Sequence, residues 1–453
     1  MAENKTKKDT GIWGMMDRLE GDKIIWIIVF FLIMISIMAI SSSTSLLALQ
    51  SHSSRLSFAG EQVIIAAMGL GIILFCYKFC SVGVFRFFSK FGFWISFAML
   101  VFLASHFDKI SFFKPVKVNE AWRVIQVGGF QLHVFEFTKI FMVMYISWAM
   151  DALKTGRTEM ADELSKIKYL AFLRKDGAKT VLYVILPIII IFGLVALGSV
   201  SSACFIGLIM GATAFIGGLK WKYILNLGIA GVAGIALIFG IYQVSGHTVF
   251  TRLGTATHRI FLASSDPLTR LHECKSGPGS EAFQKILDET MQPVSAKVAV
   301  SEGGFFGKGP GKSTQRYKVA IMYEDYMFSF IVEEYGLLGG LVIMLLYGSL
   351  LARGSMIVRN CENHYAKTVV SGLVILISGQ ALMHIFINVD LGPLTGQTLP
   401  MISHGNSSFL AFSIAFGVLL SISKMVKKKM EKEAANADPI IVKADEDSEI
   451  QED

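Results

Sequence analysis

Long apolar blocks alternate with short polar connections along most of the chain. A membrane-spanning helix needs roughly 20 predominantly apolar residues, and by that criterion the pattern predicts about ten spans. We therefore expect an all-α polytopic membrane protein with a large external loop between the seventh and eighth spans. The predicted spans are residues 24–48, 62–80, 91–106, 134–152, 180–197, 199–217, 222–245, 326–351, 367–389 and 400–423.

The composition excludes a single water-soluble globule. Of the 453 residues, 53% are hydrophobic and only 17% are charged, whereas about 25% of a soluble domain is charged. The first apolar block, from Ile24 to about Ala48, is longer than the roughly 7–15 apolar residues of a cleavable signal peptide. We therefore expect it to be retained as the first membrane helix.

The net charge of +7 follows from membrane topology. Lys and Arg gather in alternate connections, for example residues 153–179 and 424–429, and such connections face the cytoplasm. With an even number of spans, both termini are then cytoplasmic. The expected organisation is a cytoplasmic segment 1–23, a transmembrane domain 24–425 and a disordered cytoplasmic tail 426–453. We expect no nucleic-acid partner, because no basic, aromatic-interleaved domain lies outside the membrane.

Two predicted external segments are longer than simple turns. Residues 107–133 are amphiphilic, and residues 246–325 are polar and rich in glycine. Loops of that length are usually functional or disordered. In the second loop, the apolar spacing of Phe283, Ile286 and Leu287 predicts a short helix.

Ionisable residues at membrane depth are costly, so each is a functional candidate. Glu136 and Lys139 share one helix face and form either a structural ion pair or part of a pocket. Asp325 precedes the eighth span, where it is either a flanking charge or a catalyst. Glu333 and Glu334, about two turns deeper, either line a wet cavity or are paired inside the bundle.

Two glycine-containing segments break the helical pattern. Residues 303–313 miss the spacing of a phosphate-binding P-loop because Phe306 stands where glycine is required. Their backbone, with Lys308, Lys312 and Arg316, either holds a pyrophosphate or forms a flexible loop with solvated lysines. Residues 390–408 predict a broken element beside the last span, which membrane proteins tolerate only inside the protein or along a cavity.

These segments together resemble the SEDS family of peptidoglycan polymerases, whose members include FtsW and RodA. Residues 391–408 (LGPLTGQTLPMISHGNSS) resemble the family motif GLLPxTGxxLPFxSYGGSS. Residues 303–309 (GGFFGKG) resemble GGxxGxG, and residues 324–336 (EDYMFSFIVEEYG) resemble HTDFIFAVIxEELG. The similarity covers essentially residues 20–425.

The resemblance implies a role for each matching position. Asp325 stands where the family has its proposed catalytic aspartate. Residues expected to bind substrate are Glu136, Lys139, Arg259, Lys297, Lys312, Ser403 and Ser407.

Several positions depart from the family pattern. Glu324 stands where Thr is common, and His404 and Asn406 replace Tyr and Gly. A non-catalytic member is therefore conceivable, although Asp325 is retained. The lysine-rich N-terminal extension, the serine-rich end of the first span and the charged tail favour the division branch (FtsW) over the elongation branch (RodA).

The resemblance implies a glycosyltransferase that polymerises lipid II at the outer face of the bacterial cytoplasmic membrane, at the division septum. Asp325 would be the general base. Lys139, Arg259 and Lys312, or a divalent cation such as Mg²⁺ or Mn²⁺, would stabilise the undecaprenyl pyrophosphate leaving group. Expected partners are the lipid-linked glycan, a class B penicillin-binding protein and other divisome membrane proteins. Alternatives are a RodA-type elongation polymerase, a flippase that transports the lipid-linked precursor, and an inactive scaffold.

Overall fold

A computed structural model gives the fold of the protein. It describes residues 20–52, 54–105, 113–118, 121–128, 130–244, 280–319, 322–392 and 395–449.

Seven helical segments of the described chain are long and apolar enough to cross a membrane. An eighth forms if α5 (Val82–Ser89) and α6 (Gly92–Ala104), which meet at a 45° bend, are counted as one span. The seven are α2 (Lys23–Ser43), α4 (Arg55–Phe79), the run from α9 (Asp176–Thr180) to α10 (Leu186–Gly198), α12 (Trp221–Val244), α16 (Met327–Arg359), α17 (His364–Asn388) and α18 (Asn406–Glu449).

Two further helices lie in the same bundle. The helix α7 (Val134–Thr155) has 22 residues but carries buried charged side chains, and α11 (Val200–Ile216) has 17 residues. Adding these two to the eight segments above gives ten, one at each predicted span. The predicted all-α polytopic fold is confirmed.

Short polar residues fix several helix starts. Asp22 accepts a hydrogen bond from the Ile24 amide (2.9 Å) at the start of α2, and Ser54 accepts one from the Ser57 amide (3.2 Å) at the start of α4. Asn363 accepts a hydrogen bond from the Ala366 amide (3.0 Å) at the start of α17. Each cap satisfies a backbone donor that has no partner within its own helix.

Some boundaries differ from the predicted ones. The last span was expected from residue 400, but α18 begins at Asn406. Residues 395–405 instead bond to neighbouring segments, as in the hydrogen bond from the His404 amide to the Tyr323 carbonyl (2.9 Å). The first span ends at Ser43, and a short helix α3 (Ser45–Gln50) follows.

The connection predicted as an amphiphilic loop contains a small antiparallel sheet. The sheet has three strands, and each pairs with the next one along the chain. They are β1 (Phe113–Val118), β2 (Ala121–Val127) and β3 (Phe130–His133). Val124 in the middle strand is fully buried, which fits the preference of β-branched residues for a half-buried sheet. The last strand runs directly into α7, so the sheet determines where that helix begins.

Two further elements are longer than expected. The predicted short helix is α15 (Glu281–Gly303), with 23 residues. The tail expected to be disordered from residue 426 continues α18 as a helix to Glu449. Pairs at i,i+4, namely Lys427 with Glu431 (3.8 Å) and Lys429 with Glu433 (3.5 Å), support its helical start.

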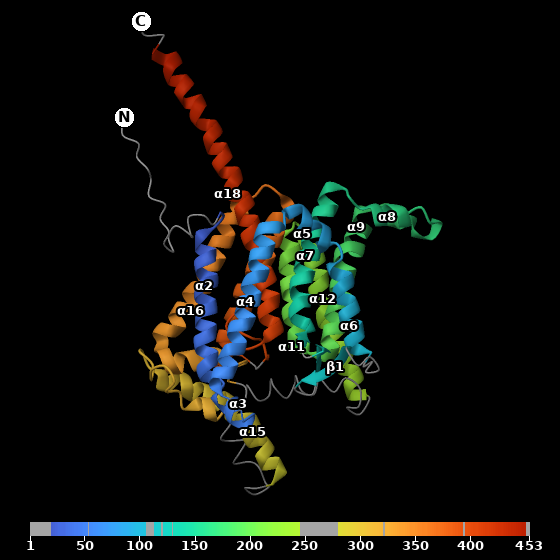
Figure 1. The fold of residues 1–453 in the computed structure, drawn as a ribbon. Helices are drawn as coiled ribbons and strands as arrows, with labels where there is room; N and C mark the ends of the chain where they lie inside the picture. Colours follow the sequence, from blue (N-terminus) through green and yellow to red (C-terminus); the bar gives the residue numbers. More distant parts are fainter. Residues whose placement is uncertain are drawn as a thin grey trace.

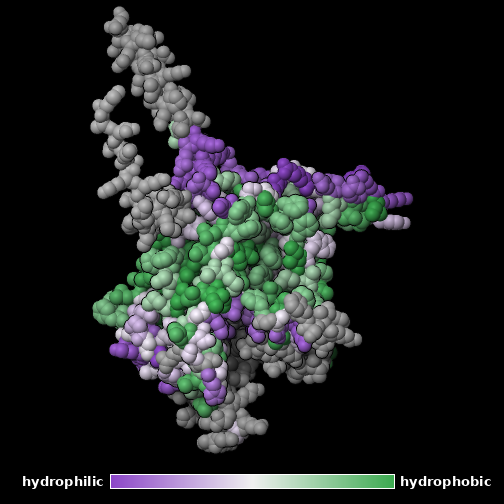
Figure 2. Space-filling view, viewed as in Figure 1, coloured by the Kyte–Doolittle hydropathy of each residue, from purple (hydrophilic) through white to green (hydrophobic). Residues whose placement is uncertain are grey.

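The bundle has two polar ends separated by an apolar band (Figures 1 and 2). One end, here called the termini face, carries the first described residues, the charged end of α18, and α8 (Glu159–Leu164). The other, the sheet face, carries β1, α3 and α15. The green band of Figure 2 separates these ends, as expected for a multi-pass membrane protein.

Candidate active site

A small polar pocket opens on the sheet face. Its volume is about 70 Å³, room for two or so waters at roughly 30 Å³ each. The ionisable residues that line it come from the sheet, α7, the turn before α16 and the segment before α18; they are Arg123, His133, Glu136, Glu324, Asp325 and His404. Asp325 and Glu136, predicted from the sequence as site residues, therefore share one pocket.

The turn that carries Asp325 is held at its backbone. Asn388 of α17 donates to the Asp325 carbonyl (3.0 Å), and Ser403 donates to the Glu324 carbonyl (2.8 Å). The carboxylate is left to face the pocket, where Gly396 approaches it closely. A Cβ on Gly396 would lie 3.8 Å from both Asp325 Oδ2 and Arg123 Nη1, so a carboxylate and a guanidinium flank this glycine.

Lys139 is buried below the pocket and holds Glu136. Its ammonium lies 2.7 Å from Glu136 Oε1 and 3.1 Å from Gln397 Oε1, and it also donates to Gln380. Only 2% of the Lys139 side chain is exposed. Because three acceptors surround the ammonium, we assign Lys139 as a positioning residue for Glu136.

Ser403 and Ser407 connect the segment before α18 to its surroundings. Ser403 accepts from the Leu399 amide (2.9 Å) while donating to the Glu324 carbonyl. Ser407 accepts from the His133 amide (2.9 Å) and so ties the end of the sheet to the start of α18. These bonds to the backbone position the pocket walls, and substrate binding by the two serines stays a prediction.

Polar atoms at the pocket remain available to a ligand. Oε2 of Glu136 and Nε2 of His404 are buried and have no hydrogen-bond partner among the described residues. Burial lowers the pKa of His404, and the nearby His133 lowers it further, so its ring is neutral at pH 7. Buried unsatisfied polar atoms cost free energy, and a polar ligand would supply their partners.

Glu324 gives the pocket a group that titrates near neutral pH. Burial, reinforced by the adjacent Asp325 charge, raises the pKa of Glu324 to about 7 from its usual 4.5. The protonated form is therefore the one that the folded protein favours. Below pH 7 Glu324 is neutral, and above it a second negative charge enters the pocket.

We expect stability to depend on this group. The contribution of Glu324 is fully present below pH 4.5 and is lost as the pH rises through about 7, at roughly 1.4 kcal/mol per unit of pKa shift. The melting midpoint of the wild type in detergent should fall over this window relative to Glu324→Gln, which cannot ionise. Parallel curves for the two proteins would contradict the raised pKa.

The glycine-rich segment, residues 303–313, packs against α16 at a break in that helix. At Gly336 the backbone is non-helical, with φ 71° and ψ −174°. The segment supplies replacement bonds: the Lys308 and Gly309 amides donate to the Glu333 and Glu334 carbonyls (2.9 Å each). A Cβ at Gly303 would lie 2.1 Å from the Val332 carbonyl oxygen, so only glycine permits this approach.

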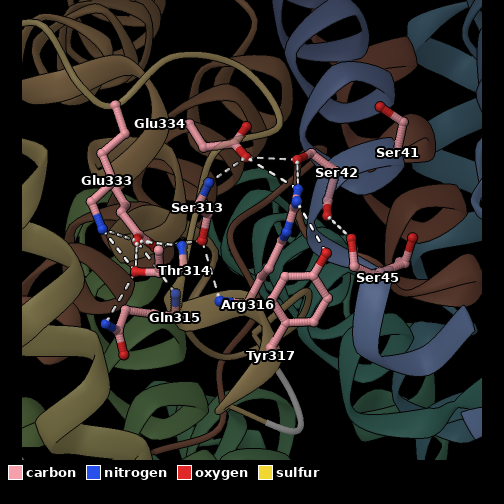
Figure 3. Close-up of polar contacts among 12 residues, drawn as sticks. Ser41, Ser42, Ser45, Ser313, Thr314, Gln315, Arg316, Tyr317, Glu333 and Glu334 are labelled. Atoms are coloured by element: carbon pink, nitrogen blue, oxygen red, sulfur yellow. Dashed lines mark hydrogen bonds and ion pairs between the residues drawn. The ribbon is translucent and has the colours of Figure 1, made fainter. Parts of the chain in front are cut away.

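Two cations of this segment pair with the two deep glutamates, and Figure 3 shows Arg316 beside Glu334 and Ser42. Lys308 Nζ lies 2.8 Å from Glu333 Oε1, and Arg316 Nη1 lies 3.7 Å from Glu334 Oε1. Ser42 of α2 donates to Glu334 (2.6 Å) and accepts from Arg316 (2.9 Å). Of the readings left open by the sequence, pairing inside the bundle is confirmed, and Lys308 and Arg316 are structural.

Removing Arg316 should destabilise the protein. Arg316→Met leaves Glu334, which is 1% exposed, as a buried charge without its cation, and breaking such a pair costs about 3–5 kcal/mol. We expect a clearly lower melting midpoint for this variant. Lys312→Met removes an exposed cation from the same segment and serves as the control; equal midpoints for both variants would contradict the structural role.

Three predicted substrate residues are not gathered at the pocket. Lys297 of α15 pairs with Asp390 (2.5 Å), and both side chains are nearly half exposed. Lys312 is exposed and is not among the residues that line the pocket. Arg259 lies outside the described residues.

The sequence did not assign several pocket residues. Arg123 and His133 come from the unpredicted sheet, and Glu324 and His404 were noted only as departures from a motif. The enrichment of residues 121–127 (AWRVIQV) in β-branched and aromatic side chains is a strand signal that would have placed Arg123 on a strand. As to metals, no group of three or more His, Cys, Asp or Glu side chains within the described ranges could hold an ion, so no step is assigned to one.

Known proteins are similar to this chain in sequence, and a solved structure is similar to it in fold. A probable peptidoglycan glycosyltransferase FtsW of Caulobacter vibrioides is 25% identical over 311 residues, which cover 67% of this chain and 65% of that protein. The protein of the same name in Geobacter sp. is 24% identical over 422 residues, covering 91% and 99%. A solved chain from a peptidoglycan synthase complex superposes with a TM-score of 0.61 at 17% identity, covering 90% and 98%.

The family assignment rests on a match across nearly the whole chain. Residues 22–428 match the model of the family described as cell cycle protein, FtsW/RodA/SpoVE. Among the described residues, that range includes the candidate spans, with α18 as far as residue 428, and the pocket on the sheet face. The protein belongs to the FtsW/RodA/SpoVE family of cell cycle proteins.

Proposed function

We propose that the protein is a peptidoglycan glycosyltransferase that polymerises lipid II. The observation that carries this proposal is the pocket shared by Asp325 and Glu136, at the sheet face of a membrane bundle. Two relatives bear the name probable peptidoglycan glycosyltransferase FtsW. A lipid-linked sugar donor would enter from the bilayer and present its sugar at this face.

Asp325 is the general base in this proposal. It accepts the proton of the acceptor 4-hydroxyl as that oxygen attacks the anomeric carbon of the lipid-linked donor. The bond between that carbon and the pyrophosphate oxygen breaks, and undecaprenyl pyrophosphate leaves. A base must lie within hydrogen-bond reach of the proton it removes, and the fixed backbone of the Asp325 turn provides such a position.

The leaving pyrophosphate requires positive charge. Lys139, predicted for this role, is buried and bound to Glu136, Gln380 and Gln397. Arg123 lines the same pocket as Asp325, and its forked guanidinium suits phosphate oxygens. We therefore assign the pyrophosphate to Arg123, with Arg259 and Lys312 retained as proposals from the family resemblance.

The proposal also sets the orientation in the membrane. Basic connections favour the cytoplasm, and lysines such as Lys424 and Lys428 lie at the termini face. Both termini are then cytoplasmic, and the sheet face with its pocket is external. The pocket, at about 70 Å³, must widen to admit a sugar.

We propose the division septum as the site of action, because the named relatives are FtsW proteins. Depletion should then produce filaments with incomplete septa. Rounded cells that still divide would instead favour the elongation role of RodA.

A class B penicillin-binding protein is the proposed partner, together with other divisome membrane proteins. A chain from a solved complex described as coordinating polymerisation and crosslinking shares this fold, which supports the pairing with a crosslinking enzyme. Pull-down from native membranes should enrich the transpeptidase over an unrelated membrane protein. Equal recovery of the two would contradict the partnership.

Complementation of a depleted strain tests the function in cells. The wild type should restore growth, and Asp325→Ala should fail at equal abundance because it lacks the base. Growth restored by Asp325→Ala would instead indicate an inactive scaffold.

A further inference from the structure

A second, larger pocket lies at the opposite end of the bundle, on the termini face. Its volume is about 620 Å³, and it lies between the end of α4, the start of α5 and α18. Among the residues that the structure describes, no Asp or Glu side chain lines it. Its charged lining consists of five lysines, Lys78, Lys424, Lys428, Lys429 and Lys432.

The arrangement of the lysines follows from the helices that carry them. Lys424, Lys428 and Lys432 are spaced by four residues, which places them on one face of α18. Lys78 lies in the last turn of α4. The two helices pack against each other along the bundle, so lysines distant in the sequence converge on one cavity.

Backbone donors add to the positive charge. Ser81, Val82 and Gly83 line the pocket at the start of α5. Ser81 occupies the N-cap position but makes no capping hydrogen bond with its side chain. The first amides of a helix have no partner within it and carry the positive end of its dipole, which suits a phosphate.

Neighbouring carboxylates neutralise only part of this charge. Glu20 lies 2.9 Å from both Lys424 and Lys428, and Lys429 pairs with Glu362. Lys78 and Lys432 have no ion pair with any carboxylate in the described part of the chain, and Lys78 lies 5.5 Å from the centre of the Phe79 ring. An unbalanced positive charge therefore remains in the cavity.

The lining is also partly apolar, which distinguishes a lipid from free phosphate. Phe79, Val82 and Met425 contribute to the wall, and 66% of the Phe79 side chain is exposed. Basic pockets at the ends of transmembrane helices suit anionic lipid head groups. We propose that this pocket binds the phosphate head group of an anionic phospholipid from the leaflet at the termini face, with an acyl chain along Phe79.

Binding of phosphatidylglycerol to the full-length protein in detergent tests the proposal. Native mass spectrometry would compare the wild type with Lys78→Gln/Lys432→Gln, which removes the two lysines without breaking a salt bridge. Each of these lysines attracts an anionic head group, so we expect the loss of both to lower the affinity about 30-fold. The control Lys220→Gln/Lys222→Gln removes two exposed lysines outside the pocket and should bind like the wild type.

Competition identifies the chemistry of the ligand. Unlabelled phosphatidylglycerol should displace the bound lipid, whereas phosphatidylcholine and inorganic phosphate should not. Displacement by inorganic phosphate at equal concentration would mean a free-anion site and overturn the lipid assignment. If the wild type, the double variant and the control bound phosphatidylglycerol with equal affinity, the proposed site would be wrong. Melting midpoints would confirm that all three proteins are folded.

Discussion

Asp325→Asn should lower the rate of glycan polymerisation by about 10²–10⁴-fold, the contribution that a positioned general base usually makes. Asparagine keeps the size and the backbone bond from Asn388 to residue 325 (3.0 Å) but cannot take up the proton. The variant should therefore fold like the wild type and fail at the chemical step. The measurement is the initial rate of lipid II consumption by purified protein.

A matched control separates the base from a general charge effect. Glu61 is an exposed carboxylate in α4, outside the pocket lining, so Glu61→Gln removes one negative charge at a distance. It should polymerise at the wild-type rate. If Asp325→Asn kept full activity, or if both variants lost it equally, Asp325 would not be the base.

Gly336→Val should prevent stable folding. A side chain at this position would begin 2.2 Å from the Phe305 carbonyl oxygen and 2.5 Å from the Gly307 nitrogen, both of them backbone atoms. The conformation at φ 71° and ψ −174° is also one that essentially only glycine adopts. Together these effects should exceed about 3 kcal/mol, a large part of the roughly 5–15 kcal/mol that stabilises a folded domain.

The yield of monodisperse protein and its melting midpoint measure this effect. Gly348, in the same helix, has open space where a side chain would begin, and Gly348→Ala should melt at or slightly above the wild type because alanine favours helix. A Gly336→Val protein with wild-type yield and midpoint would show that the break in α16 is not required.

The positions of the helices were predictable because lipid imposes a simple rule on sequence. Every backbone group in the bilayer must be bonded internally, so each long apolar block becomes a helix, as α2 and α17 show. The sheet was not predicted because β1 to β3 are short and the two longer strands carry Lys114, Lys117 and Arg123. The strands pair with one another in sequence order, and the end of the last strand is also held by Ser407, which is distant along the chain.

The site was predictable in part for a similar reason. Asp325 and Glu136 were found because a carboxylate beside a membrane span is unusual, and the family motifs agreed. The roles of the cations were harder to foresee. Nothing local in GGFFGKG reveals that Lys308 reaches Glu333, 25 residues away, or that its glycines meet the broken α16. Lys139 likewise has partners on two other segments, Gln380 and Gln397.

The most direct test of the central claim is the fate of lipid II incubated with the purified wild-type protein, alone and with its transpeptidase partner, in detergent solution. Detergent solution has no second compartment, and a transporter would leave lipid II chemically unchanged. The account predicts that labelled lipid II is converted to glycan chains that resolve as a ladder on a gel. Lipid II recovered intact from folded protein under both conditions would contradict it.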